Sequence, residues 1–535
     1  MRWWGWGDRE HVDGLTPGAL AMLRERVGIS TDPHPPVTLA SVDLAPSRLG
    51  ESDLARLRAL LGAGSVRTEL PERLLHSAGK GYPDLLRARA GRPAAAPDAV
   101  VYPRDRERLA ALLDHCVERS IAVVPFGGGT SVVGGVSPQA RAHRAVLSLD
   151  TAALDAVLGL DRAAQTVRVQ GGIRAASLER RLAEEGFTLG HFPQSFEFVS
   201  IGGCIATRSA GQASTGYGSI AEMIDGVTLV APAGTVATLA VPHTAAGPDL
   251  RQLIAGSEGT LGVVEEATLR VRRAPERLAY EGYAFADFAS GFEALRELAQ
   301  QRALPDVVRL SDESESEVQL ALAEGRPARL LGGYLRARGR GCVVIIGTEG
   351  DDRAVRSRAG HTKRVLRQAG AAPLGSGPGK AWLHGRFAAP YLRDELLTLG
   401  VMVETMETAT VWSNVEALHR EVAAAVHDAL EAQHTPGIVM CHVSHVYETG
   451  CSLYFTVIAR QDEGREIEQW RSVKRASLDA ISAAGGTVTH HHAVGEDHRE
   501  WYSHEVSPAG LRALAALRTQ LDPTGIMNPG KLLAG

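Results

Sequence analysis

The sequence has little cysteine and no long apolar run. Five cysteines among 535 residues are too few, too scattered and odd in number for a disulfide framework, and no two lie at the C-x-x-C spacing of a metal pair. They are Cys116, Cys204, Cys342, Cys441 and Cys451. We therefore expect a reducing compartment and no metal site. No run approaches the roughly 18 to 20 apolar residues that span a bilayer.

Charge of one sign is not in excess either. The 57 basic and 62 acidic residues leave a net charge of −5, which gives no general attraction to nucleic acid. Only five of the basic residues are lysine, so an arginine is by itself weak evidence of a functional site. The first residues lack the apolar core of a signal peptide. We expect a cytoplasmic protein without a nucleic-acid partner.

Glycine is abundant, with 58 residues, and the apolar pattern divides the chain into four parts. Helical spacing predicts an N-terminal helical segment over residues 1–94. Residues 95–275 alternate short apolar runs with helix-like segments such as 106–119, which is typical of an α+β domain. Residues 276–500 predict a second α+β domain, and 501–535 predict a C-terminal helix and tail.

Three segments of the first α+β domain are rich in glycine and hydroxyl side chains: residues 125–131 (PFGGGTS), 192–218 and 256–263. Because glycine leaves backbone N–H groups open to an anion, each segment can wrap a phosphate-bearing ligand. The first segment alone fits a tight turn equally well, since it matches neither the P-loop nor the dinucleotide fingerprint. Three such loops in one domain predict a large nucleotide cofactor.

Residues 490–492 are three consecutive histidines whose role the spacing leaves open. Successive strand residues point to opposite faces, so a metal site is not favoured. Packed, neutral histidines fit the pattern, and so does a role in proton handling or anion binding.

Other candidates also have plain structural alternatives. Tyr447 precedes a strand, where a tyrosine commonly packs in a core or an interface. Arg309 and Arg393 could form surface ion pairs or hold a phosphate, whose oxygens match the guanidinium fork. Residues 311–341 combine an acidic helical stretch with leucines and arginines, and they fit an exposed helix and loop, a mobile lid, or a patch that contacts membrane.

The motifs resemble a known group of flavoproteins. PFGGGTS, the GG-x-x-x-T-R-x-x-G pattern over 202–211 and GSEGTLGVV are similar to the FAD-binding domain of the vanillyl-alcohol-oxidase type flavoproteins. RWWGWGD, PDVVRLSD, YLRDELL, HVYETGCSLYF and the triple histidine resemble, within that group, the alkyldihydroxyacetonephosphate synthase family. The resemblance covers nearly the whole chain.

The resemblance implies an α+β fold with a two-part FAD-binding domain, an α+β substrate (cap) domain, and helical N-terminal and C-terminal segments, the tail returning to the FAD domain. It implies a transferase that exchanges the acyl group of acyl-dihydroxyacetone phosphate for a long-chain fatty alcohol, without net redox change. In that reading Tyr447 acts as acid/base, His490, His491 and His492 assist it, Arg393 holds the phosphate and Arg309 supports the site.

The resemblance also implies the FAD contacts, which fall in the three loops. They are Pro125, Phe126, Gly127, Gly128, Gly129, Thr130, Ser131, Gln194, Ser195, Phe196, Glu197, Phe198, Val199, Ser200, Thr207, Arg208, Ser209, Ala210, Glu258, Gly259, Thr260, Leu261, Gly262, Val263 and Val264. Family habit further implies a homodimer, and the hydrophobic substrate implies peripheral contact with a membrane.

Two departures keep other functions open. Cys204 stands where the animal enzymes have a bulkier aromatic, and the tail NPGKLL looks more like that of redox relatives. An FAD-dependent 2-hydroxy-acid dehydrogenase or oxidase is the alternative enzyme, because one fold serves many reactions. A flavin-binding protein without catalysis is the third reading. The animal enzymes' N-terminal extension and peroxisomal signal are not matched, so we do not transfer their location.

Overall fold

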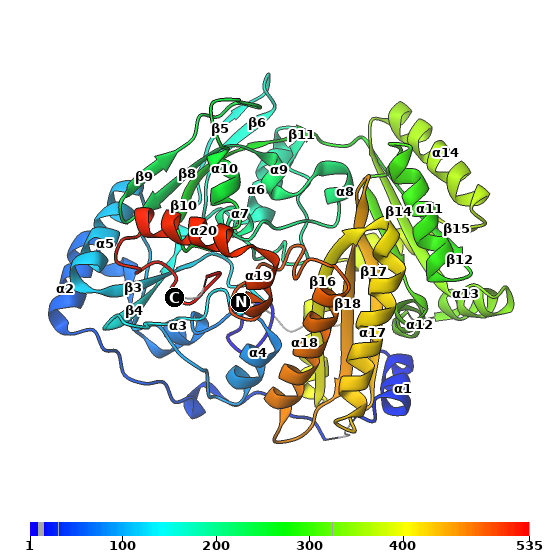
Figure 1. Ribbon diagram of the computed structural model, residues 1–535, viewed down its shortest axis with the longest axis horizontal. Coiled ribbons are helices and arrows are strands. Elements are labelled where there is room, and N and C mark those ends of the chain that lie inside the picture. The colour runs from blue at the N-terminus through cyan, green and yellow to red at the C-terminus, as the bar shows by residue number, and fades with distance from the viewer. Residues whose placement is uncertain (9–14, 30–31, 324, 534–535) are drawn as a thin grey trace.

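The structure is a computed structural model that describes residues 1–8, 15–29, 32–323 and 325–533. Figure 1 shows two smaller sheets on the left and one large sheet on the right, with the C-terminal segment crossing in front of the smaller sheets. Helices of the N-terminal region come first in the chain: α1 Pro17–Arg26, α2 Glu51–Leu61, α3 Leu70–Leu75 and α4 Tyr82–Arg89.

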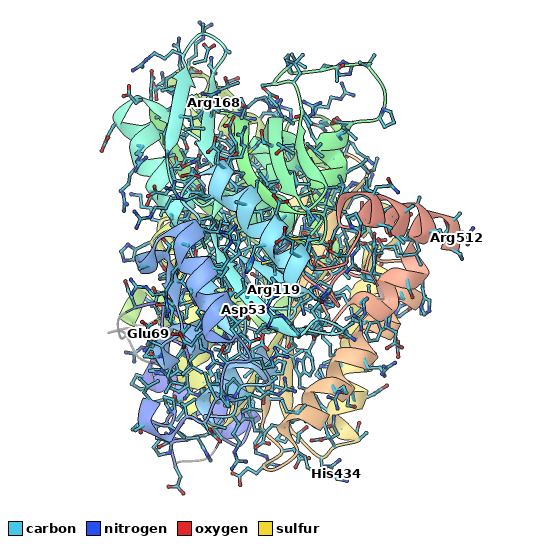
Figure 2. The ribbon with its side chains drawn as sticks, turned by 90° about the vertical axis from the view of Figure 1, so that its left-hand side faces the viewer. Asp53, Glu69, Arg119, Arg168, His434 and Arg512 are labelled. Carbon is cyan, nitrogen blue, oxygen red and sulfur yellow. The ribbon has the colours of Figure 1, made fainter. Side chains whose placement is uncertain are left out.

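The first small sheet has the order β1-β2-β4-β3, and β2, β4 and β3 run parallel. Its strands are β1 Val66–Arg67, β2 Ala99–Val101, β3 Ile121–Phe126 and β4 Ala145–Asp150. Helix α5, Arg106–Arg119, begins where the Asp105 carboxylate accepts a hydrogen bond from the Arg108 N–H. Figure 2 shows Arg119 of α5 beside Asp53 of α2, and their ion pair of 3.2 Å joins these two helices.

The second small sheet is antiparallel, in the order β5-β6-β10-β8-β9. Its strands are β5 Val157–Asp161, β6 Thr166–Gln170, β8 Ile224–Ala231, β9 Gly234–Ala237 and β10 Val263–Arg270. The helices of this region are α6 Ala175–Glu184, α7 Ile201–Ala206, α8 Ser214–Tyr217, α9 Ile220–Met223 and α10 Leu250–Ile254. The short strands β7 Phe187–Thr188 and β11 Arg272–Arg273 pair with each other in a separate two-stranded antiparallel sheet.

The third sheet has seven antiparallel strands in the order β15-β12-β14-β13-β17-β18-β16. They are β12 Arg277–Phe285, β13 Val307–Ser311, β14 Cys342–Gly350, β15 Ala372–Gly375, β16 Val401–Val411, β17 Gly437–Val446 and β18 Gly450–Arg460. Along β14, Val344 and Ile346 join one core while Val343 and Ile345 join another, so both faces of the sheet are covered.

Helices lie on both faces of this sheet. One face packs against α11 Phe288–Gln300, α14 Asp352–Gln368, α17 Val415–Glu431 and α18 Glu466–Ala483. The other packs against α1 and against α12 Glu313–Leu322, α13 Gly325–Ala337, α15 Ser376–Gly385 and α16 Ala389–Thr398. None of the helices in the described ranges is both long and apolar enough to cross a membrane.

The C-terminal segment contains two helices where the sequence pattern suggests one. Helix α19 spans Arg499–Glu505 and α20 spans Pro508–Leu521. The break falls at Ser507, whose side chain caps α20, because proline at the first position of a helix starts a new one. Beyond α20 the chain returns to the first sheet, where Met527 forms a parallel bridge with Val123 of β3.

Candidate active site

The glycine loop after β3 lies tightly against the second loop. A Cβ on Gly127 would stand 2.2 Å from Ser200 Oγ, and one on Gly128 would stand 2.3 Å from the Phe198 carbonyl oxygen. Only glycine fits such a close approach. The bare backbone there is suited to an anion.

All three predicted loops converge. The Glu258 N–H donates to the Ala206 carbonyl at 2.8 Å, which joins the third loop to the second. Gly259 of the third loop lies against Pro125 of the first. Of the predicted cofactor residues, 194–200 form the turn before α7, 207–210 follow α7, and 258–262 precede β10, which begins with Val263.

A cavity of about 200 Å³ opens at the glycine loop. Gly128 and Gly129 line it together with Lys80 and Arg174. Burial lowers the pKa of Lys80 to about 7, and its Nζ donates to the Arg2 carbonyl at 2.8 Å. Asp150 and Glu197 also line the cavity, so the bare backbone N–H groups, with Arg174 beside them, are the groups that fit the pyrophosphate of FAD.

One predicted cofactor residue has a clear structural contact. The Glu258 carboxylate is 7% exposed and accepts hydrogen bonds from the backbone N–H groups of Val494 (2.8 Å) and Gly495 (2.7 Å). Burial raises its pKa to about 7. The carboxylate therefore connects the cofactor loop to the segment that follows the histidines.

The fold brings Tyr447 and the triple histidine together. Tyr447 lies in the turn between β17 and β18, and its hydroxyl is 2.6 Å from Nε2 of His490. Nδ1 of His490 lies 2.9 Å from Nδ1 of His491, and the rings of His491 and His492 are 4.8 Å apart. These four side chains form a continuous cluster, which we call the Tyr447–histidine cluster.

The histidines lie in an irregular segment, so the expectation that strand geometry would separate them is wrong. The carboxylate of Glu407, on β16, accepts hydrogen bonds from the backbone N–H groups of His490, His491 (3.0 Å) and His492 (2.7 Å). The Thr489 hydroxyl donates to it as well, at 2.6 Å. Because one carboxylate holds three successive N–H groups, the segment curls and its rings gather.

Burial sets the protonation of this cluster. It lowers the pKa of His490 and of His491 well below the ordinary value, and neighbouring histidines lower it further. Burial also raises the pKa of the Tyr447 hydroxyl, although the side chain keeps 39% of its exposure. Near neutral pH the cluster is therefore uncharged.

The fold also brings ring nitrogens of His445, His490 and His491 within 4.8 Å of one another, a grouping that the spacing did not predict. In the structure these nitrogens have protein partners. Nε2 of His445 lies 2.9 Å from the Gly211 carbonyl oxygen, which is an acceptor, so this nitrogen carries the proton. The three histidines therefore belong to the hydrogen-bond network of the site.

Arg309 lies behind the cluster and not at its centre. Its guanidinium donates to Glu315 at 2.8 Å and lies 3.1 Å from the ring of His442. Tyr454 stacks on His442 at 4.8 Å and on His491 at 5.9 Å. Burial by itself would raise the pKa of Glu315, but Arg309 and His442 lower it, and the net shift is downward. Arg309 thus supports the wall on which the histidines pack.

Part of the Arg393 guanidinium, on α16, has no hydrogen-bond partner in the described part of the chain. Its Nη1 donates to the Lys80 carbonyl at 2.7 Å, whereas Nε and Nη2 are buried without a hydrogen-bond partner in the described part of the chain. Burial lowers its pKa, and the negative charges of Asp394 and Glu404 oppose that shift. An unpaired buried fork is costly unless a ligand such as phosphate satisfies it.

The N-terminal aromatic segment holds the helix that carries Arg393. The Asp394 carboxylate accepts from the Trp6 backbone N–H at 2.5 Å and from Arg2 at 3.3 Å. Trp6 is 3% exposed and meets Phe198 of the second loop edge to face at 5.5 Å. The segment therefore fastens the cofactor loop to α16.

Sequence reasoning missed several of these residues. Glu407, Glu315, His442, Asp394 and Lys80 are buried charged or titratable groups beside the site. An acidic residue inside an apolar strand run, as at Glu407, is the one signal that could have indicated it.

Comparison with known proteins places the chain in a class. Residues 97–240 match the family described as "FAD binding domain", and residues 274–532 match "FAD linked oxidases, C-terminal domain". The protein is thus an FAD-dependent flavoenzyme.

Its relatives define the class further. The chain is 30% identical to the alkyldihydroxyacetonephosphate synthase of Dictyostelium discoideum, over 100% of this chain and 93% of the relative. It is 32% identical to the enzyme of that name from Caenorhabditis elegans, over 88% of this chain and 81% of the relative. A solved alkyldihydroxyacetonephosphate synthase superposes with a TM-score of 0.87 at 28% identity, covering 99% of this chain and 97% of that one. The chain belongs to the alkyldihydroxyacetonephosphate synthase family.

Proposed function

We propose that the protein exchanges the acyl group of acyl-dihydroxyacetone phosphate for a long-chain fatty alcohol, giving alkyl-dihydroxyacetone phosphate, an ether lipid precursor. The observation that carries this proposal is the hydrogen bond between Tyr447 and His490, inside an uncharged histidine cluster. Such a pair can take a proton from a substrate and return it, as an exchange without net redox change requires. Full-length likeness to synthases favours this reaction over oxidation of a 2-hydroxy acid.

The contacts of the cluster form a path for a proton. In the tautomer of neutral His490 that leaves Nε2 unprotonated, the Tyr447 O–H donates to Nε2, and Nδ1 of His490 carries the proton and donates to His491. When Tyr447 accepts a substrate proton, its own proton moves to His490, and His490 passes one to His491. The resulting positive charge on His491 lies 3.5 Å from the Glu407 carboxylate, which stabilises it.

The remaining residues bind and orient. The free Nε and Nη2 of Arg393 hold the phosphate of the substrate, and Arg309 keeps His442 and Tyr454 packed against the histidines. The three converging loops would hold FAD, and the flavin would supply the electron-accepting ring that the exchange requires.

Two further proposals concern partners. Helix α13 exposes Leu330 (73%) and Tyr334 (40%), and Arg336 and Arg338 follow them, a combination suited to peripheral contact with a membrane. Residues 311–341 would then serve as the contact from which a lipid substrate enters.

We also propose that the protein forms a homodimer, and this proposal rests on the family resemblance alone.

A single assay tests the reaction. Purified flavoprotein is incubated with palmitoyl-dihydroxyacetone phosphate and labelled hexadecanol. We expect label in an alkali-stable ether lipid, with the flavin oxidised at the end. A protein that makes no ether and loses its flavin colour with D-lactate or glycolate would instead be a 2-hydroxy-acid dehydrogenase.

A further inference from the structure

The strand that leads to Tyr447 contacts the second cofactor loop, residues 192–218, just before the strand ends. His445 lies near the end of β17, two residues before Tyr447, and is 3% exposed. Its Nε2 donates to the Gly211 carbonyl oxygen at 2.9 Å. Gly211 directly follows Ala210, one of the predicted FAD contacts. One buried hydrogen bond therefore joins the second cofactor loop to the strand that presents the tyrosine.

The Gly211 carbonyl is a firmly placed acceptor. A Cβ on Gly211 would stand 2.5 Å from the Phe192 backbone nitrogen, so this position tolerates no side chain. The Gly211 N–H donates to the Ser214 hydroxyl oxygen at 2.8 Å. On the other side, the Gln212 N–H donates to the Phe192 carbonyl at 2.9 Å. Because the loop backbone is held on both sides of the carbonyl, the carbonyl gives the His445 ring a fixed reference point.

Serine hydroxyls hold the other edge of the His445 ring. Nδ1 lies 2.8 Å from the Ser444 hydroxyl oxygen and 3.2 Å from that of Ser452. Since the Gly211 carbonyl accepts the Nε2 proton, Nδ1 is an acceptor, and a serine hydroxyl donates to it. Burial lowers the pKa of His445 to about 4. Near neutral pH the ring is therefore neutral, and a change of its protonation would break one of these hydrogen bonds.

The His445 ring forms a wall for two histidines of the Tyr447–histidine cluster. Its centroid lies 4.7 Å from that of His490 and 5.4 Å from that of His491. Tyr454 stacks on His491 at 5.9 Å. The Glu407 carboxylate holds the backbone N–H groups of both histidines, but backbone contacts leave the side-chain torsions unset. The packing of His445 therefore restricts what Glu407 does not.

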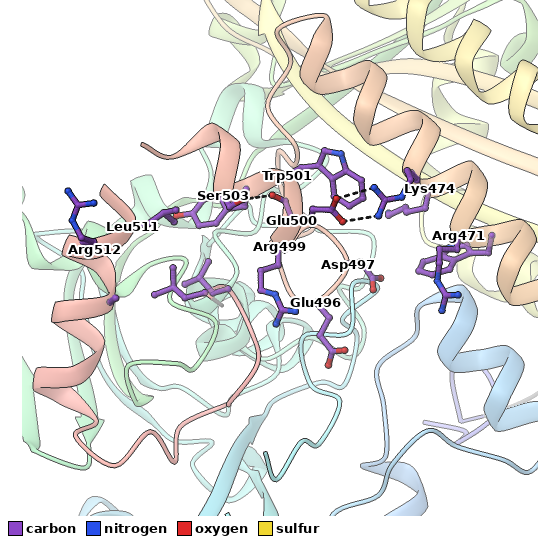
Figure 3. A pocket seen from close by; sticks show the side chains of 16 residues that line it. Arg471, Lys474, Glu496, Asp497, Arg499, Glu500, Trp501, Ser503, Leu511 and Arg512 are labelled. Atoms are coloured by element: carbon purple, nitrogen blue, oxygen red, sulfur yellow. Dashed lines mark hydrogen bonds and ion pairs between the residues drawn. The ribbon is translucent and has the colours of Figure 1, made fainter. Parts of the chain in front are cut away.

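The chain that follows the histidines offers their rings little packing. Glu496, Asp497 and residues 499–503 border a cavity of about 660 Å³ between α18, α19, α20 and the C-terminal tail (Figure 3). Atoms that face a cavity lack packing partners on that side. The contacts between His445 and the histidine rings consequently matter more for the ring positions.

We propose that His445 is a positioning residue, which fixes the rings of His490 and His491 relative to the second cofactor loop without itself exchanging a proton with the substrate. The proposal rests on the proposed function in one respect, namely that these rings receive the proton of Tyr447. A displaced ring would lengthen the hydrogen bonds of that path, and proton transfer requires hydrogen-bond reach. His445 would therefore act on the rate of reaction and not on substrate binding.

Two substitutions separate the ring of His445 from its hydrogen bonds. His445→Phe keeps a ring but leaves the Gly211 carbonyl without its donor, whereas His445→Gln keeps a donor and an acceptor. We expect kcat to fall by about tenfold or more in His445→Phe, with KM changed by less than about threefold. His445→Gln should keep a higher kcat than His445→Phe. An unchanged kcat in His445→Phe, or no recovery in His445→Gln, would overturn the proposal.

The visible circular dichroism of bound FAD gives a readout that needs no turnover. It should change in His445→Phe, because the second cofactor loop loses a contact, and return toward that of the unmodified protein in His445→Gln. Spectra that are identical in all three proteins would show that His445 does not act through this loop.

A double-mutant cycle with Tyr447→Phe tests whether His445 acts on the proton path. When the tyrosine hydroxyl is absent, His445→Phe should change kcat by less than about threefold, because both residues serve one path. Losses that multiply independently would overturn the proposal. If the protein makes no ether lipid and instead oxidises a 2-hydroxy acid, the proposed function fails, and the same cycle on that reaction still tests His445.

His143→Phe is the matched control. Nε2 of His143 lies 3.0 Å from the Gly525 carbonyl oxygen, and its Nδ1 lies 3.2 Å from the Ser120 hydroxyl oxygen, so it makes the same two kinds of contact. It precedes β4, at the end of the first sheet opposite the glycine loop. This variant should keep its kcat and its flavin spectrum. A loss of kcat as large as that of His445→Phe would show a general effect and overturn the proposal.

Discussion

The hydroxyl of Tyr447 and Nε2 of His490 are 2.6 Å apart, although 43 residues separate them in the chain. The turn between β17 and β18 presents the tyrosine, and Glu407 on β16 holds the histidine segment beside it. Two adjacent strands of one sheet therefore set the geometry of this pair, since β16 pairs with β18 along its length.

Removing one oxygen atom tests the pair. Tyr447→Phe should lower kcat by about 10² to 10⁴-fold, because the proton acceptor is lost while the ring stays in place. Flavin content and melting temperature should not change. Tyr283→Phe is the control, since it removes a tyrosine hydroxyl that donates to Glu281 on β12, away from the cluster. Full activity in Tyr447→Phe would leave the tyrosine without a role.

Glu407→Gln tests how the histidine segment is held. The amide nitrogen of glutamine would face backbone N–H groups, so we expect a loss of about 1 to 3 kcal/mol in the free energy of unfolding. We also expect kcat to fall by more than tenfold with little change in KM, because the histidines and not the substrate contacts are displaced. Denaturant titration and initial rates measure the two effects.

Glu349→Gln provides the matched control for that substitution. The Glu349 carboxylate is 7% exposed on β14 and accepts hydrogen bonds from Tyr217 and Tyr280, away from the histidines. The Glu349→Gln variant should have a lower free energy of unfolding but an unchanged kcat. Equal losses of kcat in the two variants would show that Glu407 acts only through stability.

Arg393→Lys tests the phosphate contact. Lysine keeps the charge but lacks the fork, so KM for the phosphorylated substrate should rise about tenfold or more while kcat changes less. Inorganic phosphate should compete with substrate in the unmodified protein and compete less well in the variant. A fall in kcat with KM unchanged would place Arg393 outside the phosphate site.

The depressed histidine pKa values predict a pH dependence of stability. In the unfolded chain His491 titrates near 6.5, whereas burial keeps it neutral in the folded protein to a much lower pH. Below pH 6.5 the unfolded state therefore binds more protons, and the free energy of unfolding falls by up to about 1.4 kcal/mol per pH unit for this group. Denaturant titrations of the unmodified protein and His491→Gln from pH 7.5 to 5.5 check this. The variant should lose less stability over that range, and parallel curves would contradict the assignment.

Local pattern was sufficient for much of the fold. The helix predicted over 106–119 is α5, with the same bounds, because its apolar spacing, its Asp105 cap and the strand after it agree. The three glycine-rich loops were recognised from composition, since close backbone approach restricts a position to glycine. The break before Pro508 was missed because apolar spacing continues across it.

Most of the site depends on contacts that no local pattern contains. The sequence pattern made Tyr447 and the histidines candidates, but only the family resemblance favoured catalytic roles for them, and their distance depends on strand order. Glu407 lies in a strand-like run where sequence alone cannot tell an inward carboxylate from a solvent-facing one. The contact between Asp394 and Trp6 joins residues 388 positions apart, so only tertiary structure shows it.

The bridge between Val123 and Met527 also affects the timing of folding during synthesis. Strand β3 is the outer strand of its sheet, and residues 526–528 complete hydrogen bonds with it. Those residues leave the ribosome about 400 residues after β3, so at common rates of translation the strand waits about 20 to 80 s for them. During that time the edge of the nascent cofactor domain is open to other chains or to chaperones.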